Sequence, residues 1–569
     1  MSVTAHVPGI AQFVGYDKRW LGKDIVAGLV LSALLVPQGM AYAELAGLPA
    51  VTGLYTSILC LVGYALFGPS RILVLGPDSS LGPMIAAVVI PLAGSGGDPA
   101  RAIALAAMLA IMTGAIMVAA GALRLGFVAD LLSKPTILGY MNGLALTIIV
   151  GQLPKLLGFS VDADGFVGEL TGFLSGLTAG QAVPAAAVVG IGALILILVL
   201  NRVMPKIPAV LVAVILAMIA TVVFSLGDLG VKLVGTLPQG LPSFTLPLVQ
   251  WSDIPLLFAG ALGIALVALT DTISTATSFA ERQGEEVDGD KEMIGIGAAN
   301  IAAGLFQGFP VSTSGSRTAV AEQAGGRSQL TGLVGAGVIA AMLLALPSLF
   351  ADLPQPVLGA VVISAALSLA DIPATRRLYR QRRSDFALSM VAFFGVVLLG
   401  VLPGIVVAIS LSVANVFRRV WRPHQALLGR VRDLPGYHDT GMYPQAELLS
   451  RAVIYRFDAP LIFANANTFR DEVRRLAKGA EEPFWIIVAA EPMTDVDTTG
   501  CDMLDDLALD LQADGCQLVF AELKDPVRAK LRQFGVEHAL PDDRFYPTIE
   551  SAVASCRRQT GSDWQPVAT

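Results

Sequence analysis

Apolar segments of membrane-spanning length recur along this chain as far as about residue 420, with short loops between them. A helix of about 20 apolar residues crosses the hydrocarbon core of a bilayer. The composition agrees, because 54% of the 569 residues are hydrophobic and 15% are charged, whereas an average soluble domain has about a quarter charged residues. With a mean hydropathy of +0.68, the chain is expected to be an α-helical polytopic membrane protein.

The pattern predicts fourteen membrane segments, of which two are short. They lie at residues 24–46, 51–67, 78–92, 100–121, 126–150, 183–203, 207–226, 254–280, 291–307, 316–326, 329–348, 356–370, 385–400 and 403–420. An even number of spans puts both termini on the same side of the membrane.

The basic residues of the loops gather on the side of the termini. That side holds Lys18, Arg19, Lys23, Arg71, Arg124, Lys134, Arg202, Lys206, Arg282, Lys291, Arg327, Arg376, Arg377, Arg380, Arg382 and Arg383. The opposite side holds Arg101, Lys155 and Lys232. Positive charge in short loops marks the cytoplasm, so we expect cytoplasmic N- and C-termini in a protein of the cell membrane.

The two short segments, 78–92 and 316–326, begin in a similar way. Each follows Gly and Pro residues and then serines: Gly76, Pro77, Ser79 and Ser80 in the first, and Gly308, Pro310, Ser312, Ser314 and Ser316 in the second. Interrupted segments that run in opposite directions in two halves of a chain indicate an inverted-repeat transporter with its site at the breaks. The alternative is a pair of proline-kinked structural helices.

Four motifs resemble the SulP sulfate-permease family of anion transporters. They are "LVPQGMAYAELAGLPAVTGLY" (35–55), "LGPDSS" (75–80), "NIAAGLFQGFPVSTSGSRTAV" (300–320) and "AGGRSQL" (324–330). The resemblance implies fourteen segments in a 7+7 inverted repeat, with core and gate subdomains and an elevator-type movement. It also implies that segments three and ten point their N-termini at one anion.

The second break is expected to hold that anion. A helix N-terminus carries about half a positive charge and free N–H groups. Ser314, Gly315 and Ser316 let the backbone approach an anion and supply hydroxyl donors, and Arg317 adds a full charge whose fork suits an oxyanion. The alternative for Arg317 is a structural ion pair with Asp271.

Segment one and the first break supply further candidates. Gln38 and Tyr42 lie four residues apart on one helix face, and by resemblance that face lines the anion pocket; a polar contact between helices is the alternative. Asp78 departs from the neutral or apolar residue that the resemblance implies there, and we expect it to cap the helix, facing away from the substrate, beside Ser79; a proton-linked role is the alternative. Glu44, at the outer end of segment one, is expected to be interfacial.

Segment eight contains "ALTDTISTATS", which places Asp271 one turn from Thr275 in an apolar helix. An ionisable residue in a membrane helix is a functional candidate. By resemblance, this position is the coupling-cation site, and carboxylate, hydroxyl and backbone carbonyl oxygens suit Na⁺. Sodium and proton coupling both stay open, as does a structural pair with Arg317.

Strands and helices alternate from about Tyr443, which indicates an α/β layer around a sheet. The tail resembles the STAS domain, and the resemblance suggests a role in assembling a homodimer. Thr499, in "DVDTTG", falls at the phosphorylation position of anti-sigma antagonists, while packing and regulation are the alternatives. The predicted divisions are 1–23 (cytoplasmic segment), 24–420 (transport), 421–442 (linker), 443–558 (STAS) and 559–569 (tail).

We therefore expect a secondary transporter of small oxyanions, with sulfate first and bicarbonate second, that uses Na⁺ or H⁺ and no cofactor. An uncoupled channel or exchanger on the same fold is the alternative, and the STAS tail disfavours a nucleobase carrier. The chain shows no catalytic triad, phosphate loop, structural metal spacing or nucleic-acid signature, and its net charge is −7. The three late cysteines of the four are expected to be free or buried thiols.

Overall fold

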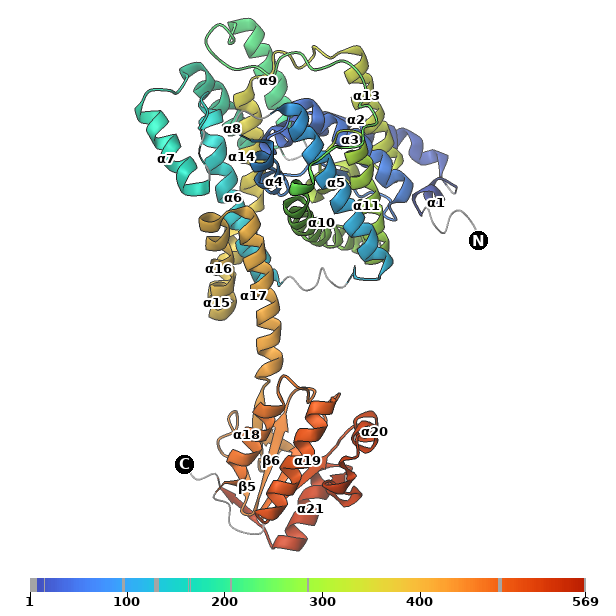
Figure 1. Cartoon of the computed structure of the whole chain (residues 1–569), viewed down its shortest axis with the longest axis vertical. Helices are drawn as coiled ribbons and strands as arrows, with labels where there is room; N and C mark the ends of the chain where they lie inside the picture. Colours follow the sequence, from blue (N-terminus) through green and yellow to red (C-terminus); the bar gives the residue numbers. More distant parts are fainter. Residues whose placement is uncertain are drawn as a thin grey trace. The chain divides into compact units, whose positions relative to one another are not determined.

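The computed structural model describes residues 8–14, 16–94, 98–126, 133–161, 163, 165–204, 207–283, 286–478 and 484–566. Lys206, the residues 127–132 of one predicted segment, and the ends of the predicted N-terminal segment and tail (1–7 and 567–569) lie outside these ranges. The chain forms two compact units, Met1–Ser412 and Val413–Thr569, both drawn in Figure 1.

Each predicted membrane segment coincides with a helix of the first unit or with α17, which leads into the second. These helices are α2 (Leu21–Leu45), α3 (Ala50–Phe67), α4 (Gly82–Ala93), α5 (Pro99–Ala122), α6 (Lys134–Leu156), α8 (Pro184–Val203), α9 (Ala209–Phe224), α10 (Ile254–Gln283), α11 (Gly289–Leu305), α12 (Gly315–Gln323), α13 (Leu330–Ala345), α14 (Gln355–Leu369), α16 (Arg383–Leu399) and α17 (Val401–Trp421). By length and composition, 8 of the described helices can cross a membrane. The count of fourteen spans and the inverted repeat stay predictions.

Three described helices were not expected from the apolar pattern: α1 (Pro8–Val14), α7 (Gly165–Thr178) and α15 (Ile372–Gln381). They are shorter than a membrane span, and α15 carries three arginines. A search for apolar runs of about 20 residues does not find them, because they have 7, 14 and 10 residues.

The helices of the first unit form two groups (Figure 1). In one group α11 packs against α5 and α3, while α13 packs against α2; in the other α6 packs against α14 and α16. Glycines permit the closest approach: a Cβ atom on Gly114 of α5 would lie 2.4 Å from the carbonyl oxygen of Gly297 on α11. Small residues at such crossings are typical of helix packing in membranes.

The second unit contains an eight-stranded sheet. Its strands are β3 (Gln425–Arg430), β4 (Tyr437–Asp439), β5 (Glu447–Leu449), β6 (Ala452–Phe457), β7 (Phe484–Ala489), β8 (Cys516–Ala521), β9 (Phe545–Tyr546) and β10 (Trp564–Pro566). The order is β10-β5-β3-β6-β7-β8-β9, with β4 paired to β3. Strands β6 to β9 are parallel, and β3 is antiparallel to β6.

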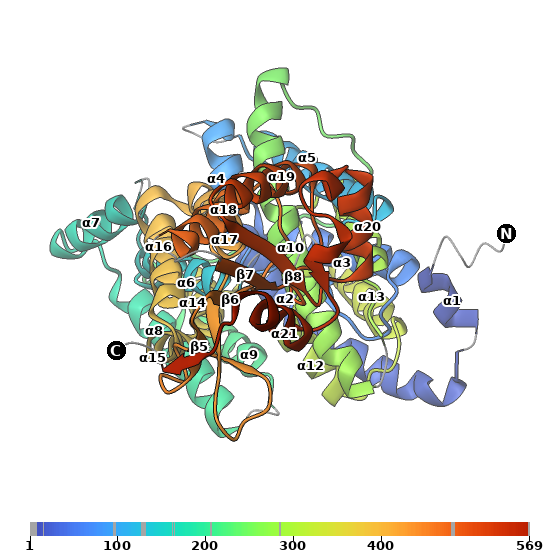
Figure 2. The ribbon, with the colours of Figure 1, turned by 90° about the horizontal axis from the view of Figure 1, so that it is seen from below.

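Alternating side chains cover the two faces of this sheet. Tyr455 and Phe457 pack under α18 (Ala466–Ala477), α19 (Thr498–Ala513) and α20 (Asp525–Gln533). Ile454 and Trp485 pack under α21 (Ile549–Thr560). Figure 2 shows α21 on the opposite face of the sheet from α18 and α19. Strands β3 and β4 lie within residues 421–442, which were predicted to be a linker, and both strands pair into the sheet. Strand β10 lies within the predicted tail and pairs with β5.

Candidate functional site

The two interrupted segments meet through a short antiparallel ladder. Strand β1 (Leu75–Gly76) pairs with β2 (Ser312–Thr313), with Leu75 opposite Thr313 and Gly76 opposite Ser312. Each strand leads into its short helix, α4 or α12. The backbone at both breaks therefore satisfies part of its hydrogen bonding from the other break, as buried irregular backbone must.

Side chains from the neighbouring helices satisfy more of this backbone. Asn300 on α11 accepts the Val311 N–H at 2.9 Å and donates to the Val311 carbonyl at 3.2 Å. Thr56 on α3 accepts the Phe309 N–H at 3.1 Å, and the hydroxyl of Thr318 accepts the Val74 N–H at 3.1 Å. The breaks are consequently held in one defined conformation.

Arg317 lies in the first turn of α12, and 2% of it is exposed. Its Nη1 donates to the Pro77 carbonyl oxygen at 2.5 Å. Its Nε and Nη2 are buried and make no hydrogen bond to any described residue. Gly76 leaves room for the guanidinium, because a Cβ atom there would lie 3.4 Å from Arg317 Cζ. Two donors of this buried guanidinium thus lack a hydrogen-bond acceptor among the described residues.

The Asp78 carboxylate contacts both this arginine and the turn that precedes α4; its orientation away from the substrate stays a prediction. Its Oδ2 lies 3.8 Å from Arg317 Nη2, and its Oδ1 accepts the Ser80 N–H at 2.9 Å. Helix α4 begins at Gly82, four residues later than predicted, because residues 79–81 form a turn. The carboxylate consequently offsets part of the positive charge at the site.

Tyr42 and Ser79 belong to the same cluster. Tyr42 is buried on α2; its hydroxyl lies against the Ser79 side chain and within electrostatic reach of Asp78 and Arg317. Gln38, one turn before Tyr42, is half-buried, and its side chain forms no hydrogen bond with another residue in the described part of the chain. The structure therefore brings Tyr42 and Ser79 to the two charges and leaves the role of Gln38 as a prediction.

The serines of the second break organise the start of α12. Ser314 is the N-cap; its Oγ accepts the Arg317 N–H at 3.4 Å and lies 3.1 Å from Ser316 Oγ. Ser316 is exposed. A Cβ atom on Gly315 would lie 3.9 Å from Thr275, so α10 reaches the same turn.

Asp271 approaches the first break rather than Arg317. The Ser80 hydroxyl lies 2.7 Å from Asp78 Oδ1 and 3.4 Å from Asp271 Oδ2, so it bridges two carboxylates. Among the described residues, the ion pair of Arg317 is with Asp78, and the alternative Asp271–Arg317 pair is not formed. Thr275 is half-buried one turn along α10, near Gly315.

A cavity of about 20 Å³ lies beside Asp271, between α10, α6 and α17. Tyr140 also lines it, and the Tyr140 hydroxyl is buried without a hydrogen-bond partner among the described residues. A volume of about 10–15 Å³ accommodates one water molecule. The cavity can therefore hold a single water or ion between a carboxylate and a phenol.

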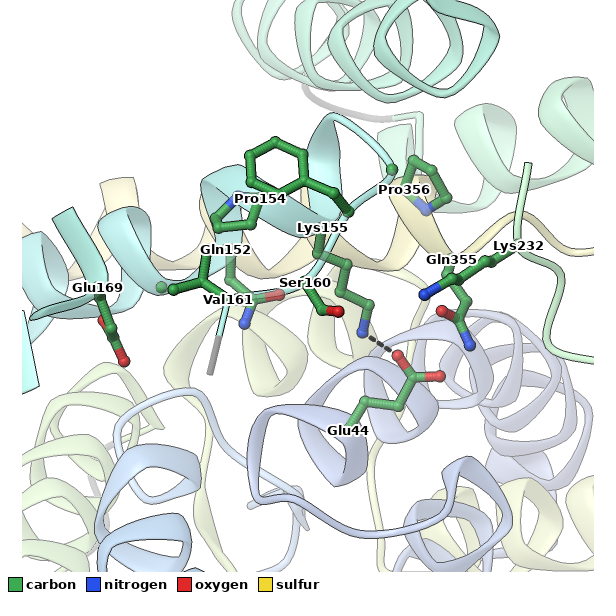
Figure 3. A pocket seen from close by; sticks show the side chains of 13 residues that line it. Glu44, Gln152, Pro154, Lys155, Ser160, Val161, Glu169, Lys232, Gln355 and Pro356 are labelled. Atoms are coloured by element: carbon green, nitrogen blue, oxygen red, sulfur yellow. Dashed lines mark hydrogen bonds and ion pairs between the residues drawn. The ribbon is translucent and has the colours of Figure 1, made fainter. Parts of the chain in front are cut away.

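A larger cavity, of about 240 Å³, lies away from the breaks (Figure 3). Lys155 of α6 forms an ion pair there with Glu44 of α2, and Lys232 and Gln355 lie beside them. Glu44, expected to be interfacial, is half-buried and paired. The ion pair joins α2 of one helix group to α6 of the other.

No group of three His, Cys, Asp or Glu side chains with metal-binding spacing occurs in the described ranges.

Thr499 is exposed in the first turn of α19. The N-cap of this helix is Asp497, whose Oδ1 accepts the Gly500 N–H at 2.8 Å. The Thr499 side chain is accessible for modification, and its phosphorylation stays a prediction.

Three site groups were missed by sequence reasoning: the Ser80 hydroxyl as a bridge, the Pro77 carbonyl, and Tyr140. The serine and the proline stand in the motif "LGPDSS" that was singled out, but the direction of a side chain follows from the turn that the backbone makes. Tyr140 lies in an apolar helix, and no sequence signal separated it from a packing residue.

Comparison with known proteins identifies both units. The sulfate permease family model matches residues 21–392, and the STAS domain model matches residues 443–552. A probable sulfate transporter of Mycobacterium tuberculosis is 41% identical over 562 residues, which cover 98% of this chain and 99% of that one. Sulfate transporter 1.3 of Arabidopsis thaliana is 30% identical over 570 residues, which cover 95% of this chain and 86% of that one.

Solved structures show the same fold. Murine SLC26A9, an anion transporter described in the inward-facing state, superposes with a TM-score of 0.89 at 24% identity over 98% of this chain and 94% of that one. The transmembrane domain of the cyanobacterial bicarbonate transporter BicA superposes with a TM-score of 0.61 at 25% identity, over 69% of this chain and 98% of that one.

Proposed function

Since the chain belongs to the sulfate permease family, whose members are transporters and not enzymes, we propose that it carries a small inorganic oxyanion, sulfate first, across the cell membrane. The observation that carries the proposal is the buried guanidinium of Arg317, whose Nε and Nη2 make no hydrogen bond to described residues and lie beside the starts of α4 and α12. A buried cation with open donors is stabilised by an oxyanion that fills them.

The proposed anion site has donors on both breaks. Arg317 Nε and Nη2 and the Ser312 hydroxyl are buried without hydrogen bonds to described residues, and Ser312 stands opposite Gly76 in the ladder. The backbone N–H groups at the start of α12 add a partial positive charge. Several acceptor oxygens on one small anion, as in sulfate, match these convergent donors.

We propose that Asp271 and Thr275 hold the coupling cation, Na⁺ or H⁺. Both lie on α10, and α10 reaches both breaks: Asp271 through Ser80, and Thr272 through Thr313, with hydroxyl oxygens 3.1 Å apart. A cation there would partly neutralise the carboxylates of Asp78 and Asp271. Loading the cation would then favour loading the anion, which is the physical basis of symport.

The proposed movement is of the elevator type. The hydrogen bonds of the β1–β2 ladder and the packing of α10 tie both breaks to the helix group of α3, α5 and α11. This group would carry the site past the group of α6, α14 and α16. We also propose that both termini are cytoplasmic and that the STAS domain assembles a homodimer.

Bicarbonate is the second candidate substrate, because the bicarbonate transporter BicA superposes on the membrane unit at 25% identity. Backbone dipoles and an arginine bind either anion, so the fold does not choose between them.

Uptake into proteoliposomes tests the proposal. Labelled sulfate and labelled bicarbonate are offered separately, with and without an inward Na⁺ gradient and with and without a pH gradient. Accumulation above the equilibrium level that depends on one gradient establishes symport of that anion. Uptake that stops at equilibrium under every gradient would contradict coupling and favour a channel or exchanger.

A further inference from the structure

Helix α15 connects α14 to α16 and begins a dense group of arginines, called here the arginine cluster. All five members are exposed: Arg376, Arg377, Arg380, Arg382 and Arg383. In the described part of the chain the cluster makes a single ion pair, between Arg382 Nε and Asp385 Oδ1 at 3.6 Å. Five arginines against two aspartates leave a net charge of +3 over residues 371–385.

The cluster is fixed in place on the membrane unit. Asn142 of α6 accepts the Asp371 N–H at 2.8 Å and donates to the Thr375 hydroxyl at 2.9 Å. Tyr379 packs edge-to-face against Phe386 of α16, with ring centroids 5.1 Å apart. Helix α15 is therefore held beside α16 rather than extended into solvent (Figure 1).

Helical spacing gives α15 three surfaces. Ala374, Thr375 and Leu378 are half-buried on one side, and the arginines at 376, 377 and 380 occupy another. Between them lie Ile372 and Tyr379, which are 65% and 54% exposed. An exposed apolar strip beside a basic face is typical of a helix that lies in the interface of a bilayer.

We propose that the arginine cluster binds the phosphate headgroups of anionic phospholipids, with Ile372 and Tyr379 in contact with the upper acyl chains. Lipid is available at this place, because α16 exposes the apolar side chains of Val391, Phe394 and Leu398. Guanidinium groups pair with phosphate through two parallel hydrogen bonds. The four arginines of the cluster that have no carboxylate partner among the described residues would thus pair with the negatively charged phosphates of the adjacent lipid leaflet.

The test uses the full-length protein in detergent, titrated with phosphatidylglycerol, with bound lipid counted by native mass spectrometry. The triple variant Arg376→Gln, Arg377→Gln, Arg380→Gln is compared with the matched triple lysine variant. Each basic residue near an anionic surface contributes about fivefold, so the glutamine variant should bind the tightest lipid on the order of 100-fold more weakly. The lysine variant should bind phosphatidylglycerol with an affinity within several-fold of that of the wild type.

Unchanged lipid binding by the glutamine variant would overturn the proposal. So would full competition by inorganic phosphate at the same concentration, which would indicate a site for a soluble anion. A change in oligomeric mass of the glutamine variant in phosphatidylcholine alone would also overturn it, since the face would then contact protein. If the triple variant does not fold, the double variant Arg377→Gln, Arg380→Gln should show about 25-fold weaker binding.

Discussion

Arg317, in the first turn of α12, donates to the carbonyl oxygen of Pro77, in the segment that leads into α4. One side chain thereby joins the two interrupted segments. In the proposed anion site the same guanidinium would hold the substrate, so substrate binding would be linked to the arrangement of the two breaks.

Replacing Arg317 by alanine should reduce sulfate uptake at least 100-fold while the protein is still expressed. Hydrogen bonds to a charged group contribute about 1.5–3 kcal/mol each, and the substitution removes two that the substrate would make. Arg317→Lys should give an intermediate result, because it keeps the charge and loses the fork. Binding of labelled sulfate to the purified variants measures the effect; wild-type affinity and turnover in Arg317→Ala would exclude the residue from the site.

Asp78→Asn should tighten anion binding by on the order of 30-fold. The Asp78 carboxylate lies 3.8 Å from Arg317 and repels an anion held by the same guanidinium. Two unit charges about 8 Å apart interact by roughly 2 kcal/mol at an effective dielectric constant near 20. Asparagine can still accept the Ser80 N–H, so the turn should persist. The KM for sulfate reports the change, and a KM that rises would show that Asp78 supports binding in another way.

Asp271→Asn should remove the dependence of uphill uptake on the coupling cation. If the cation is sodium, Thr275→Val should raise the sodium concentration needed for half-maximal uptake, since one oxygen ligand is lost. Thr221→Val is the matched control, because Thr221 is buried in α9 and bonds its own helix at Ala217. Uptake is measured at varied Na⁺ and pH. An unchanged cation response in Asp271→Asn would assign the residue a structural role.

Cys501 in the STAS domain should be labelled by maleimide more than 100-fold more slowly than an exposed cysteine at pH 8. Burial raises the pKa of the Cys501 thiol to about 11, so about one thiol in a thousand is the reactive thiolate at pH 8. Thr499→Cys supplies the exposed comparison in the same helix. Peptide-resolved mass spectrometry gives both rates, and the Cys501 rate should rise as the pH approaches 11. Equal rates would show that the buried face opens readily.

Truncation after residue 422 should leave a folded membrane unit with reduced uptake. Helix α17 ends at Trp421 and β3 begins at Gln425, so the cut removes the sheet without breaking a strand. Size-exclusion chromatography with light scattering should also show a loss of dimer. If uptake and oligomeric state both stay unchanged, the STAS domain has no part in assembly or regulation.

The sequence predicts the helices of this protein well, because long apolar runs are a strong local signal. It also locates both breaks, since glycine, proline and serine interrupt those runs. It does not reveal the contact between Asp78 and Arg317, because that contact depends on the turn over residues 79–81. The pairing of β3 with β6, and of Glu44 with Lys155, joins residues 25 or more positions apart, and no alternation or spacing encodes such partners.

The β1–β2 ladder also bears on how such a chain can diverge. Its hydrogen bonds join backbone groups, so residue types at Leu75 or Thr313 can change while the contact persists. Insertion or deletion of one residue within a strand of the ladder would instead shift the register and exchange the faces to which that strand's side chains point. Related chains are therefore expected to accept other residue types at Leu75 and to reject any change in the length of the two strands.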